Sequence, residues 1–179
     1  MMKLIILDRD GVINMDSENY IKSPDEWLPI PGSLEAIAKL TEAAYTIAVA
    51  TNQSGIARGY YDQVILEKIH QKMKKMTNEM GGIIDHIFFC PHGPNDNCLC
   101  RKPKPGLFFQ IAEYYQISLK DIPAIGDSLR DIMAATEAGC KPYLVLTGNG
   151  ELTKEKLPQF NSKQIFKTLA HAVDYLLAN

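Results

Sequence analysis

The chain has 179 residues, which is enough for one domain with a full hydrophobic core. Its 19 Lys and Arg residues nearly balance its 21 Asp and Glu residues, and there is no block of like charges, so nothing favours a nucleic acid or a membrane surface as a partner. The first apolar run stops at Asp8 and no later run could span a bilayer, so we expect a cytoplasmic protein without a signal peptide.

Residues 4–7 form an aliphatic run that ends abruptly in two carboxylates, Asp8 and Asp10. Such a run predicts a central strand of a parallel sheet, and ligands of these sheets bind beyond the carboxyl ends of the strands. Residues two apart on an extended segment point the same way, so both carboxylates should face one site while Arg9 faces elsewhere. Paired carboxylates suit a divalent cation, or a nucleophile with an acid/base; alternatively, Asp8 only caps the next helix.

Strand-like and helix-like segments alternate through the rest of the chain, which predicts an α/β fold with a parallel sheet flanked by helices. Further strands are expected at residues 46–50, 83–89, 122–126 and 142–146, helices at 33–44, 62–80, 105–115, 128–138 and 168–178, and loops at 14–30 and 147–158. The segment between Gly11 and Thr51 has no room for a separate cap domain. Residues 1–179 are therefore predicted to form a single domain whose active site is covered only by loops.

Several residue types predict details of the helices. Asp62 is a good N-cap for the second helix, and Gly139 is expected to end the fourth one in the left-handed conformation. Met73, Met76 and Met80 recur at three- and four-residue steps, which is typical of a helix face packed into the core.

Three more polar residues stand out downstream of the two carboxylates. Thr51 and Asp127 each follow a strand-like segment directly, and Lys102 lies in the basic run 101–104. Each has an ordinary explanation on its own: a turn residue for Thr51, a solvated surface charge for Lys102 and a helix cap for Asp127. Their occurrence in this order after Asp8 and Asp10 is what points to a shared site.

These motifs resemble the haloacid dehalogenase (HAD) superfamily of phosphatases, over about residues 3–147. The resemblance is carried by Asp8-x-Asp-Gly-Val, Thr51-Asn-Gln, Lys102-Pro and Gly126-Asp-Ser-Leu-Arg-Asp. It implies that Asp8 attacks phosphorus to form an aspartyl phosphate and that Asp10 serves as acid and then as base. It also implies that Thr51 and Lys102 hold the phosphoryl oxygens.

The same resemblance implies a catalytic Mg²⁺ ion. Its expected ligands are the carboxylates of Asp8 and Asp127 and the backbone carbonyl of Asp10. Asp131 is expected to stabilise the loop around Asp127 rather than to bind the metal directly.

Residues 90–100 form a loop with three thiols and one imidazole, from Cys90, His92, Cys98 and Cys100. Four such ligands on one short loop predict a closed, tetrahedral and structural Zn²⁺ site; the alternative is a set of buried cysteines beside a surface histidine. Cys140 is expected to be an inert thiol in the core. Because Arg101 and Lys102 follow the loop directly, zinc would fix two cations that can bind phosphate.

The zinc loop and the phosphatase motifs together resemble one branch of the superfamily, whose members act on a heptose bisphosphate or on histidinol phosphate. Residues 8–14 and 51–59 look like the heptose type, which would place the protein in the synthesis of the lipopolysaccharide core; histidinol phosphate or another small sugar phosphate is the alternative. Ser128 stands where some relatives carry a basic residue, which leaves the contact to a second phosphate open. The expected partner is a small phosphorylated sugar bound by a monomer. The candidate specificity residues are Asp16, Asn19, Tyr20, Asn52, Gln53, Ser54, Arg58 and Arg101.

Two other classes of protein share part of this pattern of residues. A two-component receiver domain also forms an aspartyl phosphate beside Thr and Lys, although its phosphorylated Asp lies on a middle strand and it needs no zinc loop. A zinc-stabilised binding module without catalysis would not need Asp8, Asp10, Lys102 and Asp127 together. His70, His86 and His171 have no comparable partners in the sequence and are expected to be ordinary surface or core residues.

Overall fold

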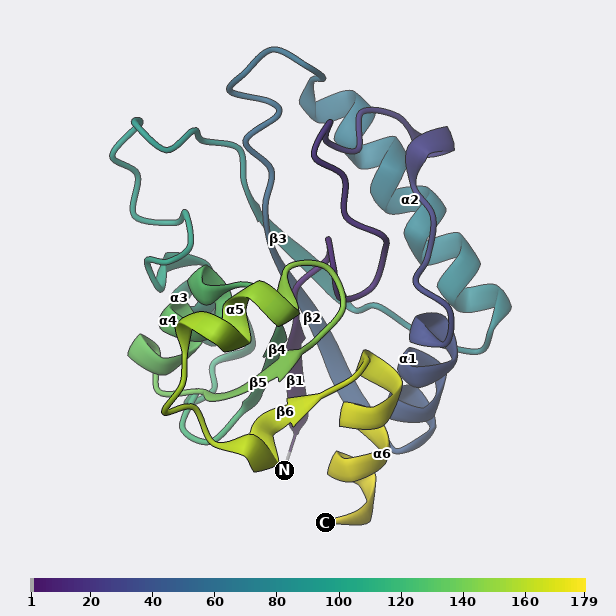
Figure 1. Cartoon of the computed structure of the whole chain (residues 1–179). Coiled ribbons are helices and arrows are strands. Elements are labelled where there is room, and N and C mark those ends of the chain that lie inside the picture. Colours follow the sequence, from purple (N-terminus) through teal and green to yellow (C-terminus); the bar gives the residue numbers. More distant parts are fainter. Residues whose placement is uncertain (1) are drawn as a thin grey trace.

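Six parallel strands form the centre of the structure, a computed structural model that describes residues 2–179 (Figure 1). Their spatial order is β3-β2-β1-β4-β5-β6, so the N-terminal strand lies inside the sheet, between β2 and β4. This arrangement confirms the predicted α/β fold with a parallel sheet flanked by helices. The strands span Lys3–Leu7 (β1), Tyr45–Asn52 (β2), His86–Cys90 (β3), Pro123–Gly126 (β4), Lys141–Val145 (β5) and Ile165–Phe166 (β6).

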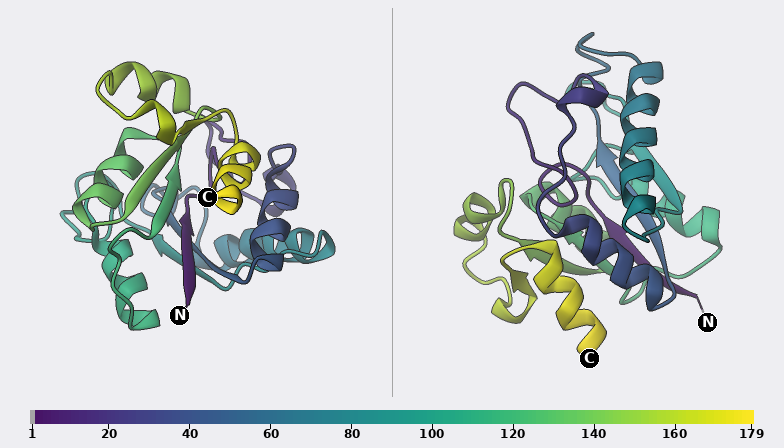
Figure 2. Two further views of the ribbon diagram at one scale, coloured as in Figure 1. Left: turned by 90° about the horizontal axis from the view of Figure 1, so that it is seen from below. Right: turned by 90° about the vertical axis from the view of Figure 1, so that its right-hand side faces the viewer.

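Helices cover both faces of the sheet, as the two views in Figure 2 show. On one face α1 packs against α2 and α6, and on the other face α3 and α4 lie against the strands. The helices span Ser33–Glu42 (α1), Gln63–Glu79 (α2), Gly106–Tyr115 (α3), Leu129–Glu137 (α4), Gly150–Lys156 (α5) and Leu169–Ala178 (α6), with short 3₁₀ segments at Pro24–Glu26 and Ser162–Gln164. Within residues 2–179, no helix combines the length and the apolar character that crossing a membrane requires.

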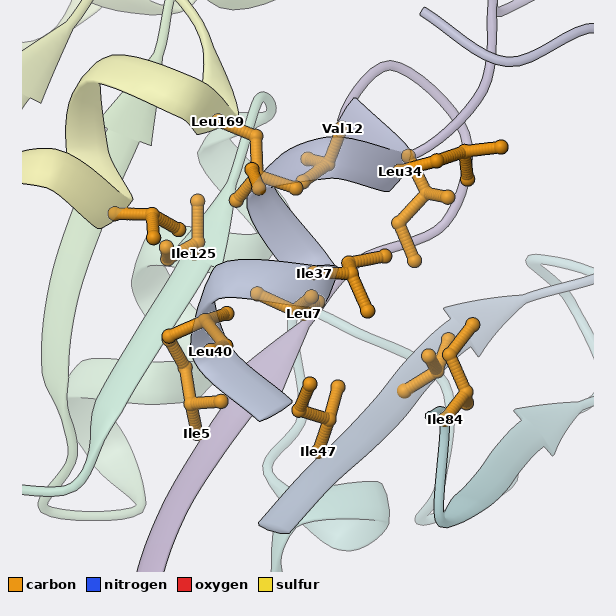
Figure 3. Close-up of a cluster of buried hydrophobic side chains, with 14 of the residues drawn as sticks. Ile5, Leu7, Val12, Leu34, Ile37, Leu40, Ile47, Ile84, Ile125 and Leu169 are labelled. Atoms are coloured by element: carbon orange, nitrogen blue, oxygen red, sulfur yellow. The ribbon is translucent and has the colours of Figure 1, made fainter. Parts of the chain in front are cut away.

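Alternate residues of β1 point into the two hydrophobic cores. Ile5 and Leu7 belong to the core beneath α1, α2 and α6, where Figure 3 shows Leu7 beside Ile37 and Ile5 beside Leu40 of α1. Leu4 and Ile6 belong to the core beneath α3 and α4. Each fully buried aliphatic side chain contributes about 1.5–3 kcal/mol, so four in succession keep β1 in the middle of the sheet. The strand must therefore end where the first carboxylate appears.

The carboxyl ends of the strands meet at one edge of the sheet, at the top of Figure 1, where the longest loops gather. Loop 14–30 is held over this edge by the fully buried Trp27. Lys72 of α2 also holds it, because its Nζ donates hydrogen bonds to the carbonyl oxygens of Trp27 (2.9 Å) and Pro24 (2.7 Å). Between β1 and β2 the chain forms only this loop, its 3₁₀ segment and α1, as expected for a site covered by loops.

The predicted helix ends agree with the structure. The Asp62 carboxylate accepts a hydrogen bond from the backbone N–H of Ile65 (2.8 Å) at the start of α2, and Gly139 follows α4 with φ +84°. Cys140 is buried as predicted, and burial raises the pKa of its thiol to about 12, which makes it a poor nucleophile at neutral pH.

Two expectations are wrong in part, and one strand was not predicted. Residues 147–158 contain the helix α5, which its polar sequence conceals because few of its side chains are buried. The two-residue strand β6 is too short to leave an alternating pattern. Among the methionines of α2, only Met73 is fully buried, whereas Met76 is half-buried and Met80 is exposed beyond the end of the helix.

Candidate active site

A cavity of about 350 Å³ opens at the carboxyl ends of the strands. Asp8, immediately after β1, lies on its floor together with Lys102 and Asp127. Most of its lining residues carry polar side chains, and four of them are arginines: Arg9, Arg58, Arg101 and Arg130. A polar cavity lined by both arginines and carboxylates suits an anionic ligand that binds together with a metal cation.

Three carboxylates crowd the floor of this cavity. Asp8, Asp127 and Asp131 each place an oxygen within 4.8 Å of the others. Asp131 is already saturated: its Oδ2 accepts from the Ser128 hydroxyl (2.7 Å), and its Oδ1 accepts from Lys102 Nζ (2.6 Å). The carboxylates of Asp8 and Asp127 are therefore the better candidates for direct ligands of a divalent cation, and Asp131 holds the loop around them.

The pKa values also separate Asp8 and Asp127 from Asp131. Burial, reinforced by the charge of Asp131, raises the pKa of Asp8 to about 7 and that of Asp127 to about 9. Burial also acts on Asp131, but the neighbouring Lys102 ammonium and the hydrogen bond from it lower its pKa below the usual range. Asp8 and Asp127 are thus short of positive charge, which a bound cation would supply.

Lys102 is the cation that the structure itself brings to Asp8. Its side chain is 3% exposed, and its Nζ lies 3.0 Å from Asp8 Oδ1 and 2.7 Å from the carbonyl oxygen of Ala50. Burial opposes its charge, but Asp131 and Asp8 together raise its pKa, so it stays protonated. Lys102 is therefore a fixed positive charge beside the candidate nucleophile.

Asp10 lines the same cavity, and its carboxylate pairs with Arg9, which the sequence had predicted to face away from the site. Arg9 was expected to face away, yet its Nη2 donates to Asp10 Oδ1 at 2.8 Å, and its guanidinium also contacts His70. Although burial acts in the opposite direction, the charge of Arg9 lowers the pKa of Asp10. The expectation failed because a long side chain can curl back around its own backbone, and β1 ends before Arg9.

Two glycines leave room for the Asp127 carboxylate. Gly11 has φ +83° and Gly148 has φ +56°, and a Cβ atom on either one would collide with Asp127 Oδ2. The freed space lets the backbone N–H of Asn149 donate to the same oxygen at 2.7 Å. The loop after β5 therefore packs directly on a candidate metal ligand.

Thr51, which was expected to hold the phosphoryl oxygens, is fully buried and accepts a hydrogen bond from Gln53 Nε2 (2.9 Å) without lining the cavity. The predicted specificity residues fall into two groups. Asn19 lies in a neighbouring hollow outside the main cavity. The other predicted specificity residues line the cavity: Asp16, Tyr20, Asn52, Gln53, Ser54, Arg58 and Arg101.

The cavity also contains residues that the sequence did not single out as ligands. Arg130 projects from the first turn of α4, and Asn149 joins Asp16 (2.9 Å) to the Asp127 loop. Arg130 could have been found, because it stands three residues after the metal-site Asp127 and so near the same strand end. Asn149 could not, because residues 147–158 carried no sign of a fixed conformation.

The zinc-loop residues converge beside this cavity. Cys90 Sγ lies 3.7 Å from Cys98 Sγ and 3.5 Å from His92 Nδ1, and His92 Nδ1 lies 3.3 Å from Cys100 Sγ. A tetrahedral zinc ion with ordinary bond lengths requires separations of about 3.8 Å between sulfurs and about 3.5 Å between sulfur and nitrogen. The four side chains therefore fit a zinc ion, with His92 contributing Nδ1.

Comparison with known proteins identifies relatives across the whole chain. A family model described as HAD-hydrolase-like matches residues 99–172. The chain is 53% identical over 176 residues to a D-glycero-beta-D-manno-heptose-1,7-bisphosphate 7-phosphatase of Bordetella bronchiseptica, covering 98% of both chains. The equivalent protein of Pseudomonas putida is 57% identical over 155 residues, which is 87% of this chain and 89% of that one.

Solved structures agree with these relatives. The crystal structure of the Bordetella bronchiseptica D,D-heptose 1,7-bisphosphate phosphatase, complexed with magnesium and phosphate, superposes with a TM-score of 0.96 at 53% identity and covers 99% of each chain. The Burkholderia thailandensis phosphatase superposes with a TM-score of 0.78 at 40% identity, again with 99% of each chain covered. The chain therefore belongs to the family of D-glycero-beta-D-manno-heptose-1,7-bisphosphate 7-phosphatases among the HAD-like hydrolases.

Proposed function

We propose that the protein is a Mg²⁺-dependent phosphatase that removes the 7-phosphate of D-glycero-D-manno-heptose 1,7-bisphosphate through an aspartyl phosphate on Asp8. The observation that carries this proposal is the buried Asp8, held 3.0 Å from Lys102 and grouped with Asp127 in a cavity rimmed by arginines. The relatives are named for the beta anomer of this sugar, and we extend that preference to this chain.

In the first step, a carboxylate oxygen of Asp8 attacks phosphorus, and the bond between phosphorus and the sugar oxygen breaks. Asp10 gives a proton to the departing oxygen, which leaves as a hydroxyl group. Although burial opposes it, Arg9 lowers the pKa of Asp10 in the free protein, so the carboxylate must take up this proton together with the anionic substrate, whose negative charge favours the protonated form. Lys102 donates to the charged phosphoryl oxygens from a fixed position. Thr51, near the end of β2, contributes by accepting a hydrogen bond from Gln53 and so orienting its amide.

In the second step, Asp10 takes a proton from a water molecule, whose oxygen attacks the phosphorus of the aspartyl phosphate. The bond to Asp8 breaks, inorganic phosphate leaves and the Asp8 carboxylate is regenerated. Asp10 thus acts as an acid and then as a base, which returns the protein to its starting state after each turnover.

Asp8, Asp127 and the backbone carbonyl of Asp10 would hold the magnesium ion. The crystal structure of the Bordetella relative contains magnesium and phosphate, which supports a magnesium site in this family. When bound, the ion would neutralise charge on the phosphoryl group and on the two carboxylates. The raised pKa values of Asp8 and Asp127 support this assignment, since Lys102 only partly offsets the burial of Asp8 and no cation contributes to the pKa of Asp127.

Magnesium binding should therefore depend on pH in a defined direction. The folded-state pKa values of about 7 for Asp8 and about 9 for Asp127 exceed the ordinary value, so protons stabilise the metal-free fold at low pH. That stability is lost as the pH rises through 7 and then 9, because the anions are buried away from water and are repelled by Asp131. We expect the increase in melting temperature caused by Mg²⁺ to grow from pH 6 to pH 9. An increase that is independent of pH, or is kept by Asp127→Asn, would contradict this site.

The second phosphate of the substrate requires cations away from Lys102. Arg58, Arg101 and Arg130 all line the cavity, and after burial it is the charge of Arg130 that most lowers the pKa of Arg101. Like charges held this close indicate a place for a dianion. We assign the 1-phosphate to Arg101 and Arg130. These arginines would supply the positive charge that some relatives carry at the position of Ser128, whose side chain is neutral.

Arg101→Ala should raise KM for the bisphosphate by about 10- to 100-fold, because one charge-assisted contact is lost. KM for a monophosphate should change by less than about threefold, since only the transferred phosphate then binds. The control is Lys120→Ala, which removes the same charge from an exposed residue outside the cavity. Equal effects of Arg101→Ala on both substrates would place the second phosphate elsewhere.

A substrate panel tests the proposed function directly. We expect kcat/KM for heptose 1,7-bisphosphate to exceed those for histidinol phosphate and fructose 1,6-bisphosphate by at least about tenfold, because a site without a cap domain selects through its arginine contacts. A higher value for histidinol phosphate would replace the proposed substrate and leave the aspartyl-phosphate mechanism in place.

The remaining assignments follow from this function. We infer a single-domain protein of residues 1–179 that works as a monomer in the cytoplasm and supplies heptose to the lipopolysaccharide core. Support for the single domain comes from the one continuous sheet.

A further inference from the structure

Arg9 is a buried cation that the proposed chemical steps do not use. Its side chain is 1% exposed, and its guanidinium lies between Asp10 and His70. A guanidinium is costly to bury unless every side of it finds a partner. Its Nε (3.3 Å) and Nη2 (2.8 Å) donate to Asp10 Oδ1, and its Nη1 lies 3.2 Å from His70 Nε2.

His70 fixes the far side of this guanidinium. Burial, with the charge of Arg9 adding to it, lowers the pKa of His70 to about 3. The imidazole is therefore neutral, and the lone pair on Nε2 accepts the hydrogen bond from Arg9 Nη1. His70 lies in the long helix α2, next to core residues such as Ile69, so its ring position is set by the fold.

The other oxygen of Asp10 is held in a similar way. Gln53 Nε2 donates to Asp10 Oδ2 at 2.9 Å, and Gln53 Oε1 accepts the hydroxyl proton of Tyr61 at 2.6 Å. Tyr61 is buried directly before α2, and burial raises its pKa to about 12, so the hydroxyl remains a donor. This donor fixes the orientation of the Gln53 amide, with its NH₂ group toward Asp10.

The two oxygens of Asp10 differ in how many donors they meet. Oδ1 accepts from Arg9 through two N–H groups and from Asn14 Nδ2 (3.0 Å), which exhausts its lone pairs. Among residues 2–179, Oδ2 accepts only from Gln53, so it keeps one lone pair free for a proton. Oδ2 is thus the atom that can carry and release the catalytic proton.

We propose that His70 and Tyr61 are positioning residues for the acid/base: through Arg9 and Gln53 they hold the Asp10 carboxylate so that Oδ2 exchanges the proton with the leaving oxygen. This inference rests on the proposed phosphatase function. It adds that the segment 61–70, which includes neither an expected metal ligand nor the nucleophile, determines the efficiency of proton transfer.

Single-turnover experiments with enzyme in excess isolate the step that needs the acid. Protonation matters for the poor leaving group of heptose 1,7-bisphosphate and hardly at all for p-nitrophenyl phosphate. Tyr61→Phe and His70→Leu should each slow phosphoryl transfer from the sugar by about 10-fold or more, and from p-nitrophenyl phosphate by less than about twofold. His70→Gln, whose amide oxygen can accept from Arg9, should restore most of the rate.

Tyr60→Phe is the matched control, because this exposed neighbour of Tyr61 lies outside the cavity. Equal losses for the two substrates, or no loss in Tyr61→Phe, would overturn the proposal. If His70→Leu does not fold, the proposal is still tested by Tyr61→Phe and His70→Gln. A slow Tyr61→Phe with a parent-like His70→Gln supports the proposal. A slow His70→Gln contradicts the role of His70 as the acceptor for Arg9. Failure of the proposed function would look different, because the parent protein itself would then release no phosphate from the sugar.

Discussion

Replacing Asp8 with Asn is expected to lower kcat/KM for phosphate release by at least about 10⁴-fold, because it removes the nucleophile that all later steps depend on. An amide oxygen is a poor nucleophile, and the exchange also removes one anionic oxygen from the metal site. The fold should be retained: Asn has nearly the same shape, and Lys102 Nζ keeps Asp131 and the carbonyl oxygen of Ala50 as partners.

The thermal stability of this variant provides a second test of the same site. Because burial raises the pKa of Asp8 to about 7, its anion destabilises the metal-free fold above that pH. Asp8→Asn without metal should therefore melt at or above the temperature of the parent at pH 8. Asp121→Asn, an exposed exchange of the same kind, is the control. Parent-like turnover by Asp8→Asn, or an acid-stable phosphoryl group on another residue, would remove Asp8 from the mechanism.

The parts of this site that the sequence could predict are those that depend on short stretches of chain. The run from Leu4 to Leu7 must be buried, so the first carboxylate has to stand at the end of the strand. The four zinc-loop residues lie within eleven positions, so the segment between them is too short to let their side chains move far apart. In both cases the spacing along the chain determines which side chains lie together, and contacts between distant segments are not needed to predict it.

The parts that the sequence could not predict depend on contacts between distant segments. His70 contacts Arg9 across 61 residues, and Asn149 contacts Asp16 across 133 residues. In sequence, His70 is one more residue on the face of a helix. Its role appears only when α2 lies beside the loop after β1, which depends on the packing of α1 against α2. The helix α5 was missed for a related reason: its buried Thr153 bonds to the backbone of Asp127 instead of joining an apolar face.

Loss of the zinc ion is expected to have the second-largest effect, and Cys98→Ser is the variant that tests it. Binding of a structural zinc ion contributes about 10–16 kcal/mol in small zinc domains, so the loop 90–100 should not keep its conformation without the metal. We expect about one tightly held zinc per chain in the parent, much less in Cys98→Ser, and a clearly lower melting temperature. Cys140→Ser is the control, because its buried thiol lies apart from the four ligand atoms.

The kinetic effect of zinc loss should divide unequally between Arg101 and Lys102. The zinc loop holds Arg101, whose Nη1 donates to the carbonyl oxygen of His92 (3.3 Å) and whose backbone N–H faces Cys98 Sγ (3.4 Å). Lys102 has a second support outside the loop, since Asn52 forms two hydrogen bonds with its backbone (3.0 and 3.1 Å).

Cys98→Ser should therefore raise KM for the bisphosphate, through Arg101, by a larger factor than it lowers kcat for a monophosphate, through Lys102. Equal changes in the two constants would mean that the loop and the catalytic lysine act as one unit. A zinc-free protein with parent-like melting and kinetics would exclude a structural role for the metal.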